Sequence, residues 1–234
     1  MDVSDYNLET LRRDAEFVLY RGFAKRPDDN SPSRLLILAP ALERPAPETL
    51  RRMEHELSLK EELDADWAVR PLTLTQFQGR NVLVLEDPGG EPLDRLVTKP
   101  MELRQFLRLG IGLTAALSRL HERGLIHKEI KPANVLVNPS TGQVWMMGFG
   151  IASRLQRQRQ LPEPPEFIAG TLAYMAPEQT GRMNRSVDSR SDLYALGVTL
   201  YEMLTGALPF SATDPVEWVH CHIARQPVAP CEKR

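Results

Sequence analysis

The apolar residues of the first 90 positions fall in short runs separated by turn-forming residues. Residues 17–23 and 34–39 form two such runs, and a third at 81–85 is followed by the turn formers of 87–90. Short apolar runs bounded by Gly, Pro, Asn and Asp are typical of β-strands. The charged segment 48–63 follows two prolines and predicts a helix. We therefore expect a strand-rich region that contains one helix.

The remaining residues show mainly helical periodicity. Apolar side chains recur every three or four positions over residues 102–123, 191–205 and 214–225, which predicts three helices. Two short apolar runs at 134–138 and 144–147 predict a small strand pair. The second half of the chain is therefore expected to be helical, with little sheet.

Two further features concern the ends of these segments. Ser191 is expected to cap the N-terminus of the second helix through its hydroxyl group, and Gly206 is expected to follow the last helical residue. Residues 155–166 contain alternating arginine and glutamine and then three prolines, a pattern that indicates an extended loop.

Composition excludes several classes of protein. The 234 residues are 42% hydrophobic and 26% charged, with a net charge of −2, which favours neither nucleic acid nor an acidic lipid surface as partner. Cys221 and Cys231 form no disulfide framework, so we expect a reducing, cytoplasmic location. The N-terminus lacks an apolar signal segment. The longest apolar stretch, 193–204, is too short and too polar to span a membrane.

Several short motifs occur in a consistent order and spacing, and together they resemble a eukaryotic-type protein kinase domain. They are His127-Lys128-Glu129-Ile130-Lys131-Pro132-Ala133-Asn134, Gly148-Phe149-Gly150, Gly170-Thr171, Ala176-Pro177-Glu178 and Ser191-Asp192-Leu193-Tyr194. The first resembles the catalytic loop of the family. The second stands where the family has Asp-Phe-Gly.

The resemblance implies an α+β, bilobal fold. A small β-rich N-lobe is expected over residues 1–88, and a helical C-lobe that is incomplete at its C-terminal end is expected over 89–234. The stretch 177–185 is similar to kinase-like domains at the front of large bacterial signalling proteins that also carry an ATPase module and a sensor histidine kinase. The expected partner is a protein or a neighbouring signalling domain.

The catalytic loop keeps part of the family's chemistry. Lys131 matches the lysine that contacts the transferring phosphoryl group, although a surface lysine is the alternative. Asn134 matches a Mg²⁺ ligand, and it equally suits a turn-capping role. Glu129 replaces the catalytic Asp; the extra methylene displaces the carboxylate, and a misplacement of about 1 Å costs on the order of 10²-fold in rate. His127 matches a structural histidine, and Lys128 replaces an arginine that pairs with phosphate.

Gly148 is the most severe departure from the family. The family's Asp at this position chelates the Mg²⁺ that bridges the β- and γ-phosphates, and glycine supplies no ligand. Asn134 alone leaves a weak Mg²⁺ site, since Mg²⁺ requires several oxygen donors. Phe149 and Gly150 retain the other two positions of the motif.

The phosphate-binding elements of the N-lobe also differ from the family. Asp14 and Phe17 occupy positions where the family has loop glycines, which allow backbone amides to approach phosphate. The strand at 35–40 carries no lysine for the α- and β-phosphates. Glu56 matches the family's glutamate that pairs with this lysine, and without the lysine a solvated helix charge is expected at Glu56.

Other residues retain framework roles in the resemblance. Asp192 matches a buried Asp that accepts backbone hydrogen bonds from the catalytic loop, and Glu178 matches a glutamate that pairs with an arginine. Thr171 matches a threonine that hydrogen-bonds the catalytic base, with phosphorylation as an alternative. Leu136 is one of the residues expected to bind the nucleotide cofactor.

The hinge of the family falls after the strand at 81–85. Leu85 matches the gatekeeper, and Glu86, Asp87 and Pro88 form the hinge. Backbone groups there leave ATP binding open, although Pro88 removes one donor.

Three functions follow from these departures. The first is a pseudokinase, a kinase-fold signalling or regulatory module with weak or no phosphotransfer. The second is a weak or atypical Ser/Thr protein kinase that uses Glu129, Lys131 and Asn134 to transfer the ATP γ-phosphate to a protein hydroxyl. The third is a kinase-like enzyme that transfers another part of the nucleotide. The combined losses favour the first.

Overall fold

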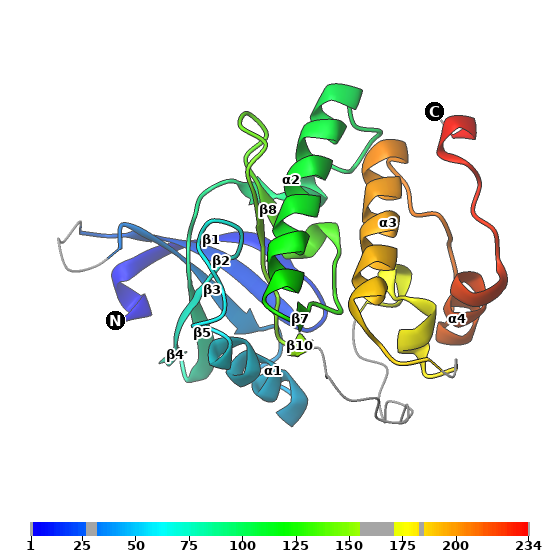
Figure 1. The fold of residues 1–234 in the computed structure, drawn as a ribbon. Coiled ribbons are helices and arrows are strands. Elements are labelled where there is room, and N and C mark those ends of the chain that lie inside the picture. The colour runs from blue at the N-terminus through cyan, green and yellow to red at the C-terminus, as the bar shows by residue number, and fades with distance from the viewer. Residues whose placement is uncertain (1, 27–31, 155–170, 183–184, 234) are drawn as a thin grey trace. The chain divides into compact units, whose positions relative to one another are not determined.

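The structure, a computed structural model, describes residues 2–26, 32–154, 171–182 and 185–233 (Figure 1). The chain divides into two compact units. Unit 1 comprises Met1–Gly89 and Met147–Gly150, and unit 2 comprises Gly90–Met146 and Ile151–Arg234. Gly148-Phe149-Gly150, which follow the catalytic loop in the sequence, therefore belong to unit 1.

Unit 1 is built on an antiparallel sheet of five strands in the order β1-β2-β3-β5-β4. The strands are β1 (Tyr6–Arg13), β2 (Phe17–Ala24), β3 (Arg34–Pro40), β4 (Pro71–Phe77) and β5 (Arg80–Glu86), and one helix, α1 (Pro47–Ser58), packs against β4 and β5. A short turn, η1 (Val3–Asp5), precedes β1. The predicted strands at 17–23, 34–39 and 81–85 are confirmed.

The register of the sheet separates its two faces. Leu35, Ile37 and Ala39 point to one face, where they join a cluster with Tyr6, Val82 and Val84. Leu36 and Leu38 point to the other face, beside Leu19, Leu83 and Leu85, because these residues are register partners. All five leucines of this second face are at most 5% exposed. The sheet therefore has apolar side chains on both faces.

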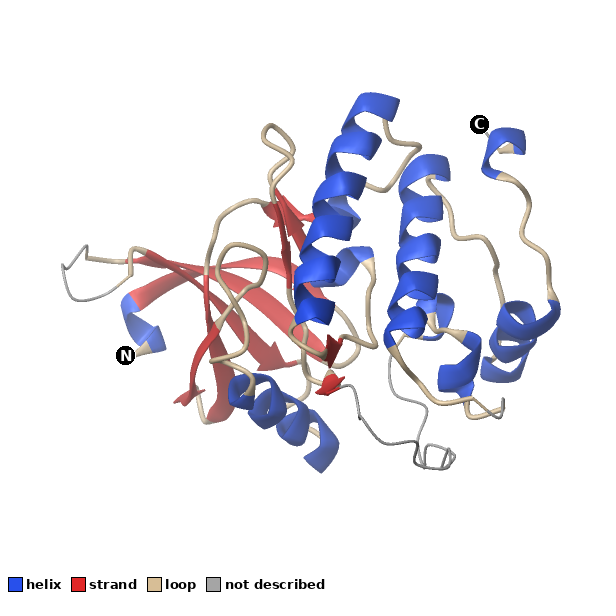
Figure 2. Cartoon of the chain, in the orientation of Figure 1, coloured by secondary structure: helices blue, strands red, loops and turns tan. Residues whose placement is uncertain are grey.

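Unit 2 is mainly helical, as Figure 2 shows by colour. Its helices are α2 (Leu103–Glu122), α3 (Ser189–Thr205) and α4 (Pro215–Ala224). Its short strands are β6 (Glu91–Pro92), β8 (Val135–Val137) and β9 (Val144–Met146) in one sheet, and β7 (Leu125–Ile126) and β10 (Ser153–Arg154) in another. Its 3₁₀ turns are η2 (Leu93–Arg95), η3 (Pro132–Asn134), η4 (Leu172–Tyr174), η5 (Pro177–Thr180) and η6 (Pro230–Glu232).

The two units confirm the predicted α+β fold, with a strand-rich N-terminal region and a helical C-terminal part. The predicted helices match α1 to α4 with shifted ends; α1 stops at Ser58 and not at residue 63. β1 and β4 were not predicted. The sequence of β1 is mostly polar, and that of β4 begins with a proline and alternates threonine with leucine.

The helix ends supply one confirmation and one correction. Gly206 follows α3 with a φ of 70°, as predicted. Ser191 is not the N-cap: Asp188 caps α3 by accepting a hydrogen bond from Arg190 N, and Ser191 is a fully buried residue inside the first turn. The loop predicted at 155–166 lies outside the described residues. Within the described part of the chain, no helix is both long enough and apolar enough to cross a lipid bilayer.

Candidate functional site

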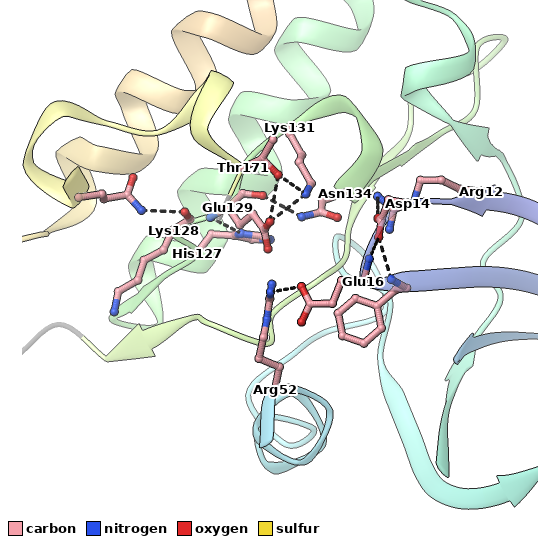
Figure 3. A network of polar contacts seen from close by, with 12 residues as sticks. Arg12, Asp14, Glu16, Arg52, His127, Lys128, Glu129, Lys131, Asn134 and Thr171 are labelled. Carbon is pink, nitrogen blue, oxygen red and sulfur yellow. Dashed lines mark hydrogen bonds and ion pairs between the residues drawn. The ribbon is translucent and has the colours of Figure 1, made fainter. Parts of the chain in front are cut away.

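The catalytic-loop residues of unit 2 lie between β7 and η3, and their side chains form one polar set (Figure 3). Lys131 Nζ donates to Glu129 Oε1 at 2.8 Å and to Thr171 Oγ1 at 2.6 Å. Thr171 Oγ1 lies 3.3 Å from the same Glu129 oxygen. The structure thus brings together three of the residues predicted from sequence. The ammonium of Lys131 neutralises the Glu129 carboxylate.

Two neighbouring side chains hold the backbone of this loop. Asn134 Nδ2 donates to the carbonyl oxygen of Glu129 at 2.9 Å, and His127 Nδ1 accepts from Glu129 N at 3.2 Å. His127 is fully buried and Asn134 is 5% exposed. The amide nitrogen of Asn134 therefore serves the loop conformation, which is the turn-capping role that the sequence left open.

Asp192, in the first turn of α3, accepts hydrogen bonds from the start of the same loop. Its Oδ2 accepts from His127 N and its Oδ1 from Lys128 N, both at 2.8 Å. His121, at the end of α2, places Nε2 2.8 Å from Oδ2. The carboxylate is fully buried. A single side chain therefore joins α2, α3 and the catalytic loop.

Lys128 has a strained backbone, since its φ of 68° lies in the left-handed region that side-chain-bearing residues rarely adopt. Both of its backbone polar groups are bound: the N–H by Asp192 and the carbonyl by Gln179 Nε2 at 2.8 Å. Burial lowers the pKa of the Lys128 amine, and the nearby Asp192 carboxylate opposes that effect. The surrounding hydrogen bonds thus stabilise a conformation that the residue alone disfavours.

The segment after Thr171 is held from two helices. His222 of α4, 7% exposed, contacts the carbonyl oxygen of Leu172 through Nε2 at 2.8 Å and the hydroxyl of Tyr194 through Nδ1 at 2.8 Å. Tyr174, at the end of η4, donates to Glu202 of α3 at 2.6 Å. These contacts fix η4, and with it the residue that bonds Glu129 and Lys131.

Glu178 has a local partner in unit 2. Ser191 Oγ donates to Glu178 Oε1 at 2.5 Å, so the carboxylate of η5 joins the first turn of α3. Gln179, the next residue, also accepts from Ala176 N through its side-chain oxygen at 3.1 Å. The Ala176-Pro177-Glu178 motif is therefore tied to both α3 and the catalytic loop.

In unit 1, the turn between β1 and β2 consists of Asp14, Ala15 and Glu16. Asp14 Oδ1 accepts hydrogen bonds from Glu16 N at 2.9 Å and Phe17 N at 2.7 Å. Arg12 Nη1 lies 3.6 Å from the other Asp14 oxygen. The turn that should cover phosphates in the resembling family thus has a carboxylate of its own on two backbone amides (Figure 3).

Arg52 of α1 joins the helix to this turn. Its Nη1 donates to Glu16 Oε2 at 2.5 Å, and its guanidinium carbon lies 5.7 Å from the centre of the Phe17 ring. A Cβ atom added at Gly150 would lie 3.0 Å from Cβ of Arg52 and 3.1 Å from its carbonyl oxygen. Glycine at position 150 therefore permits the close approach of the 147–150 segment to α1.

Glu56, one turn after Arg52, is 2% exposed, so the expectation of a solvated helix charge is wrong. Its Oε1 accepts a hydrogen bond from Gly148 N at 3.3 Å. Gly148 has a φ of 80°, which glycine adopts without strain. Phe149 is fully buried and meets the Trp67 ring edge-on, with centroids 6.4 Å apart. The backbone N–H at position 148 thus gives the buried glutamate a donor.

The hinge residues are bound within unit 1. Arg21 binds the buried Asp87 carboxylate through two nitrogens, with Nε 2.8 Å from Oδ2 and Nη2 3.1 Å from Oδ1. Glu86 N donates to the Arg70 carbonyl at 2.8 Å. Leu85 is fully buried on the face that also carries Leu36. The expected adenine-side residue of unit 2, Leu136, is fully buried in β8.

Mg²⁺ requires several oxygen ligands in octahedral geometry. Within unit 2, the Glu129 carboxylate is bound to Lys131 and the Asn134 amide nitrogen is bound to a carbonyl. Gly148, in unit 1, has no side-chain donor. Among the described residues, no group of three or more His, Cys, Asp or Glu side chains is placed to hold a metal ion.

Sequence reasoning missed four residues that these networks depend on: Asp14 as a cap, Arg52, Gln179 and His121. Only Asp14 could have been predicted from the sequence. An Asp at the start of a turn commonly accepts hydrogen bonds from the backbone amides two and three residues later. The partners of the other three lie 36, 51 and 71 positions away in the sequence.

Comparison with known proteins bears on this arrangement. The family described as protein kinase domain matches residues 41–230. A probable serine/threonine-protein kinase of Corynebacterium efficiens is 36% identical over 64% of this chain and 23% of its own length. Serine/threonine-protein kinase PksC of Streptomyces coelicolor is 37% identical over 63% and 27%, and pkn3 of Myxococcus xanthus is 30% identical over 80% and 35%.

The chain thus spans between 23% and 35% of the length of these relatives. The family match begins just after β3 and covers α1, the hinge and the catalytic loop. It supports the order of motifs seen in the sequence and the fold of the two units. The chain belongs to the protein kinase domain family.

Proposed function

We propose that this chain is a kinase-fold signalling module that works by binding a protein partner or a neighbouring signalling domain, with weak or no phosphotransfer. The observation that carries the proposal is the β1–β2 turn. The Asp14 carboxylate accepts from Glu16 N and Phe17 N, the kind of backbone donors that would otherwise bind a phosphate. A phosphate at this turn would have to displace the Asp14 carboxylate from the two amides. It would also be repelled by the negative charges of Asp14 and Glu16.

A second group of residues supports the same proposal. On the face of Leu19 and Leu85, the buried β3 side chains are Leu36 and Leu38, and the exposed Arg34 stands at the start of the strand. Glu56 is buried and accepts a hydrogen bond from Gly148 N. The α- and β-phosphates of ATP would therefore find no lysine on β3.

The hinge adds a third argument. Of its three residues, Glu86 uses its N–H on Arg70 and Pro88 has no N–H. The Asp87 side chain is held by Arg21. An adenine would have few donors at this edge, so we expect weak or undetectable binding of ATP.

The wider context forms part of the proposal. The matched relatives are bacterial serine/threonine-protein kinases, which supports a bacterial signalling role. Both cysteines of the chain are free, which supports a reducing, cytoplasmic compartment. We place the module at the front of a larger protein with ATPase and sensor histidine kinase parts, on the likeness of the stretch 177–185.

The test is a titration of the chain with ATP and ADP, with and without Mg²⁺, in which the melting temperature of the chain is measured. We expect no Mg²⁺-dependent shift, because the catalytic-loop carboxylate of Glu129 is bound to Lys131 and position 148 supplies no carboxylate. The variant Gly148→Asp should behave in the same way, since the β1–β2 turn and β3 remain unchanged. A rise of a few degrees with Mg·ATP, absent with ATP alone, in the unmodified chain would overturn the proposal.

One observation favours a weak Ser/Thr kinase as a second candidate. Glu129, Lys131 and Thr171 form a set in which a carboxylate, an ammonium and a hydroxyl meet within 3.3 Å. Glu129 would accept the proton of the substrate hydroxyl, and Lys131 would stabilise negative charge on the transferring group. Incubation with γ-labelled ATP tests this candidate: label on a protein hydroxyl must appear and must vanish in Glu129→Gln. α-Labelled ATP separates transfer of another part of the nucleotide.

A further inference from the structure

The exposed face of α2 in unit 2 carries an apolar stripe. Leu103, Leu107 and Ile111 are 49%, 51% and 70% exposed, and they are spaced four residues apart along the helix. Residues four apart lie on one helix face, so the three side chains form a continuous row about 12 Å long. The opposite face holds the buried residues Leu109, Leu113, Leu117 and Leu120. The row is therefore additional to the side of α2 that serves the core.

Positive charge borders this row. Arg104 and Lys99 are exposed, and within the described part of the chain neither forms an ion pair or a hydrogen bond. Arg108 is also exposed, and its Nη1 donates to the carbonyl oxygens of Pro139 at 3.3 Å and Ser140 at 2.8 Å. Carbonyl groups orient a guanidinium without cancelling its charge. Three exposed cations, with the exposed carboxylate of Glu102 at the N-cap of α2 beside them, thus accompany three exposed apolar side chains.

We propose that this face of α2 is a docking surface for an amphipathic helix with acidic residues along one edge. Apolar side chains of such a helix would cover Leu103, Leu107 and Ile111, and its carboxylates would pair with Arg104, Arg108 and Lys99. The linear row suits a helix better than a compact loop, because a helix presents apolar residues with the same spacing.

The charges argue against a second copy of this chain as the occupant. A twofold contact through α2 would place Arg104 and Arg108 of both copies near one another, and like charges at an interface are unfavourable. The carboxylates of an acidic helix would attract these arginines, whereas the arginines of a second copy would repel them. The surface lies within unit 2 and uses none of the groups that the nucleotide titration tests.

The test is fluorescence anisotropy of the full chain with labelled 20-residue helical peptides. One peptide carries leucines on one face and glutamates along its edge, and its match carries lysines in place of the glutamates. We expect the acidic peptide to bind and the lysine peptide not to bind. Ile111→Asp and Arg104→Glu should each lower the affinity for the acidic peptide by roughly tenfold or more. This is the loss expected for one hot-spot contact.

A matched control is Val216→Asp on α4, since Val216 is 74% exposed and lies outside the stripe. It should leave binding unchanged. Arg104→Glu should in addition bind the lysine peptide more tightly than the unmodified chain does. All three positions are exposed, so melting temperatures should stay close to that of the unmodified chain.

Four results would overturn the proposal. They are equal binding of the two peptides, binding that Ile111→Asp and Arg104→Glu leave unchanged, and equal weakening by Val216→Asp. The fourth is a different occupant: binding to phosphatidylglycerol vesicles without binding of the acidic peptide, or a dimer in sedimentation that Ile111→Asp dissociates.

Discussion

The start of the catalytic loop in unit 2 and the β1–β2 turn in unit 1 use the same chemistry for different ends. In each, one aspartate accepts hydrogen bonds from two successive backbone amides: Asp192 from His127 and Lys128, and Asp14 from Glu16 and Phe17. In unit 2 the carboxylate comes from α3, which is distant in the sequence, and it stabilises the loop conformation. In unit 1 it comes from the turn itself and occupies the donors.

Burial separates the two carboxylates further. Asp192 has a side-chain exposure of 0%, whereas that of Asp14 is 38%. Removing a buried acceptor leaves its donors without water, whereas water replaces an exposed one at little cost. The comparison teaches that the same contact can serve different ends: it supports the fold in unit 2 and, under the proposed function, takes the place of a phosphate in unit 1.

The largest effect is expected for Asp192→Ala. The change leaves His127 N and Lys128 N without their acceptor in the interior and removes the contact with His121. We expect a loss of about 3–5 kcal/mol in the free energy of unfolding, measured by urea denaturation with a probe in unit 2. Asp188→Ala, which removes the half-buried N-cap of α3 and its ion pair with the exposed Arg190, should cost about 1 kcal/mol. Equal losses would show that Asp192 is not the central acceptor.

Glu56→Ala tests the equivalent contact in unit 1. It removes the acceptor of Gly148 N and leaves a space in the core, for an expected loss of about 2 kcal/mol in unfolding free energy. The matched change Glu54→Ala concerns an exposed carboxylate of the same helix and should stay within about 0.5 kcal/mol. If both variants melt like the unmodified chain, the buried placement of Glu56 is contradicted.

Asp14→Ala removes two hydrogen bonds from a turn that water can reach. We expect a loss of about 1 kcal/mol in unfolding free energy, a fraction of the Asp192→Ala effect. Nucleotide binding should not appear, because β3 still lacks a lysine. Thermal denaturation with and without Mg·ATP measures both quantities, and a gain of Mg·ATP binding would mean that Asp14 alone blocks the turn.

The smallest effect expected is the contribution of His222 to the pH dependence of stability. Burial lowers its pKa below the ordinary value of 6.5, with the hydrogen bond to Leu172 opposing. The unfolded chain then binds the proton more readily, so this contribution to stability is present above pH 6.5 and is lost as pH falls through the folded pKa.

The slope from one such group is at most about 1.4 kcal/mol per pH unit. His222→Gln should flatten the curve of unfolding free energy between pH 7 and pH 5. His220→Gln, a change at an exposed residue of the same helix, should leave the curve as it is. An unchanged slope in His222→Gln would contradict a buried, neutral imidazole at this position.

The sequence predicted most of the helices because their apolar spacing reports directly on a buried face. It predicted the middle strands of the sheet for the same reason, since β3 and β5 are apolar on both faces. It failed for β1 and β4, whose polar residues face water at the edges of the sheet.

The candidate site was predictable only where position in a motif implies a role. Glu129, Lys131 and Thr171 were identified in this way, and the structure brings them together. Glu56 was misjudged because a missing lysine was taken to mean a missing partner. One donor to Glu56 is a backbone N–H 92 positions away, and the sequence carries no side-chain signal for it.

The capped turn has an evolutionary consequence. A change of Asp14 to glycine would release two amides and lower stability without creating a lysine on β3 or a metal ligand. A change of Gly148 to aspartate would place a side chain at a φ of 80°, which also lowers stability. Under the proposed function, neither change alone restores nucleotide binding. On that proposal these costs act as an evolutionary ratchet, which leaves selection free to act on the surfaces of the fold.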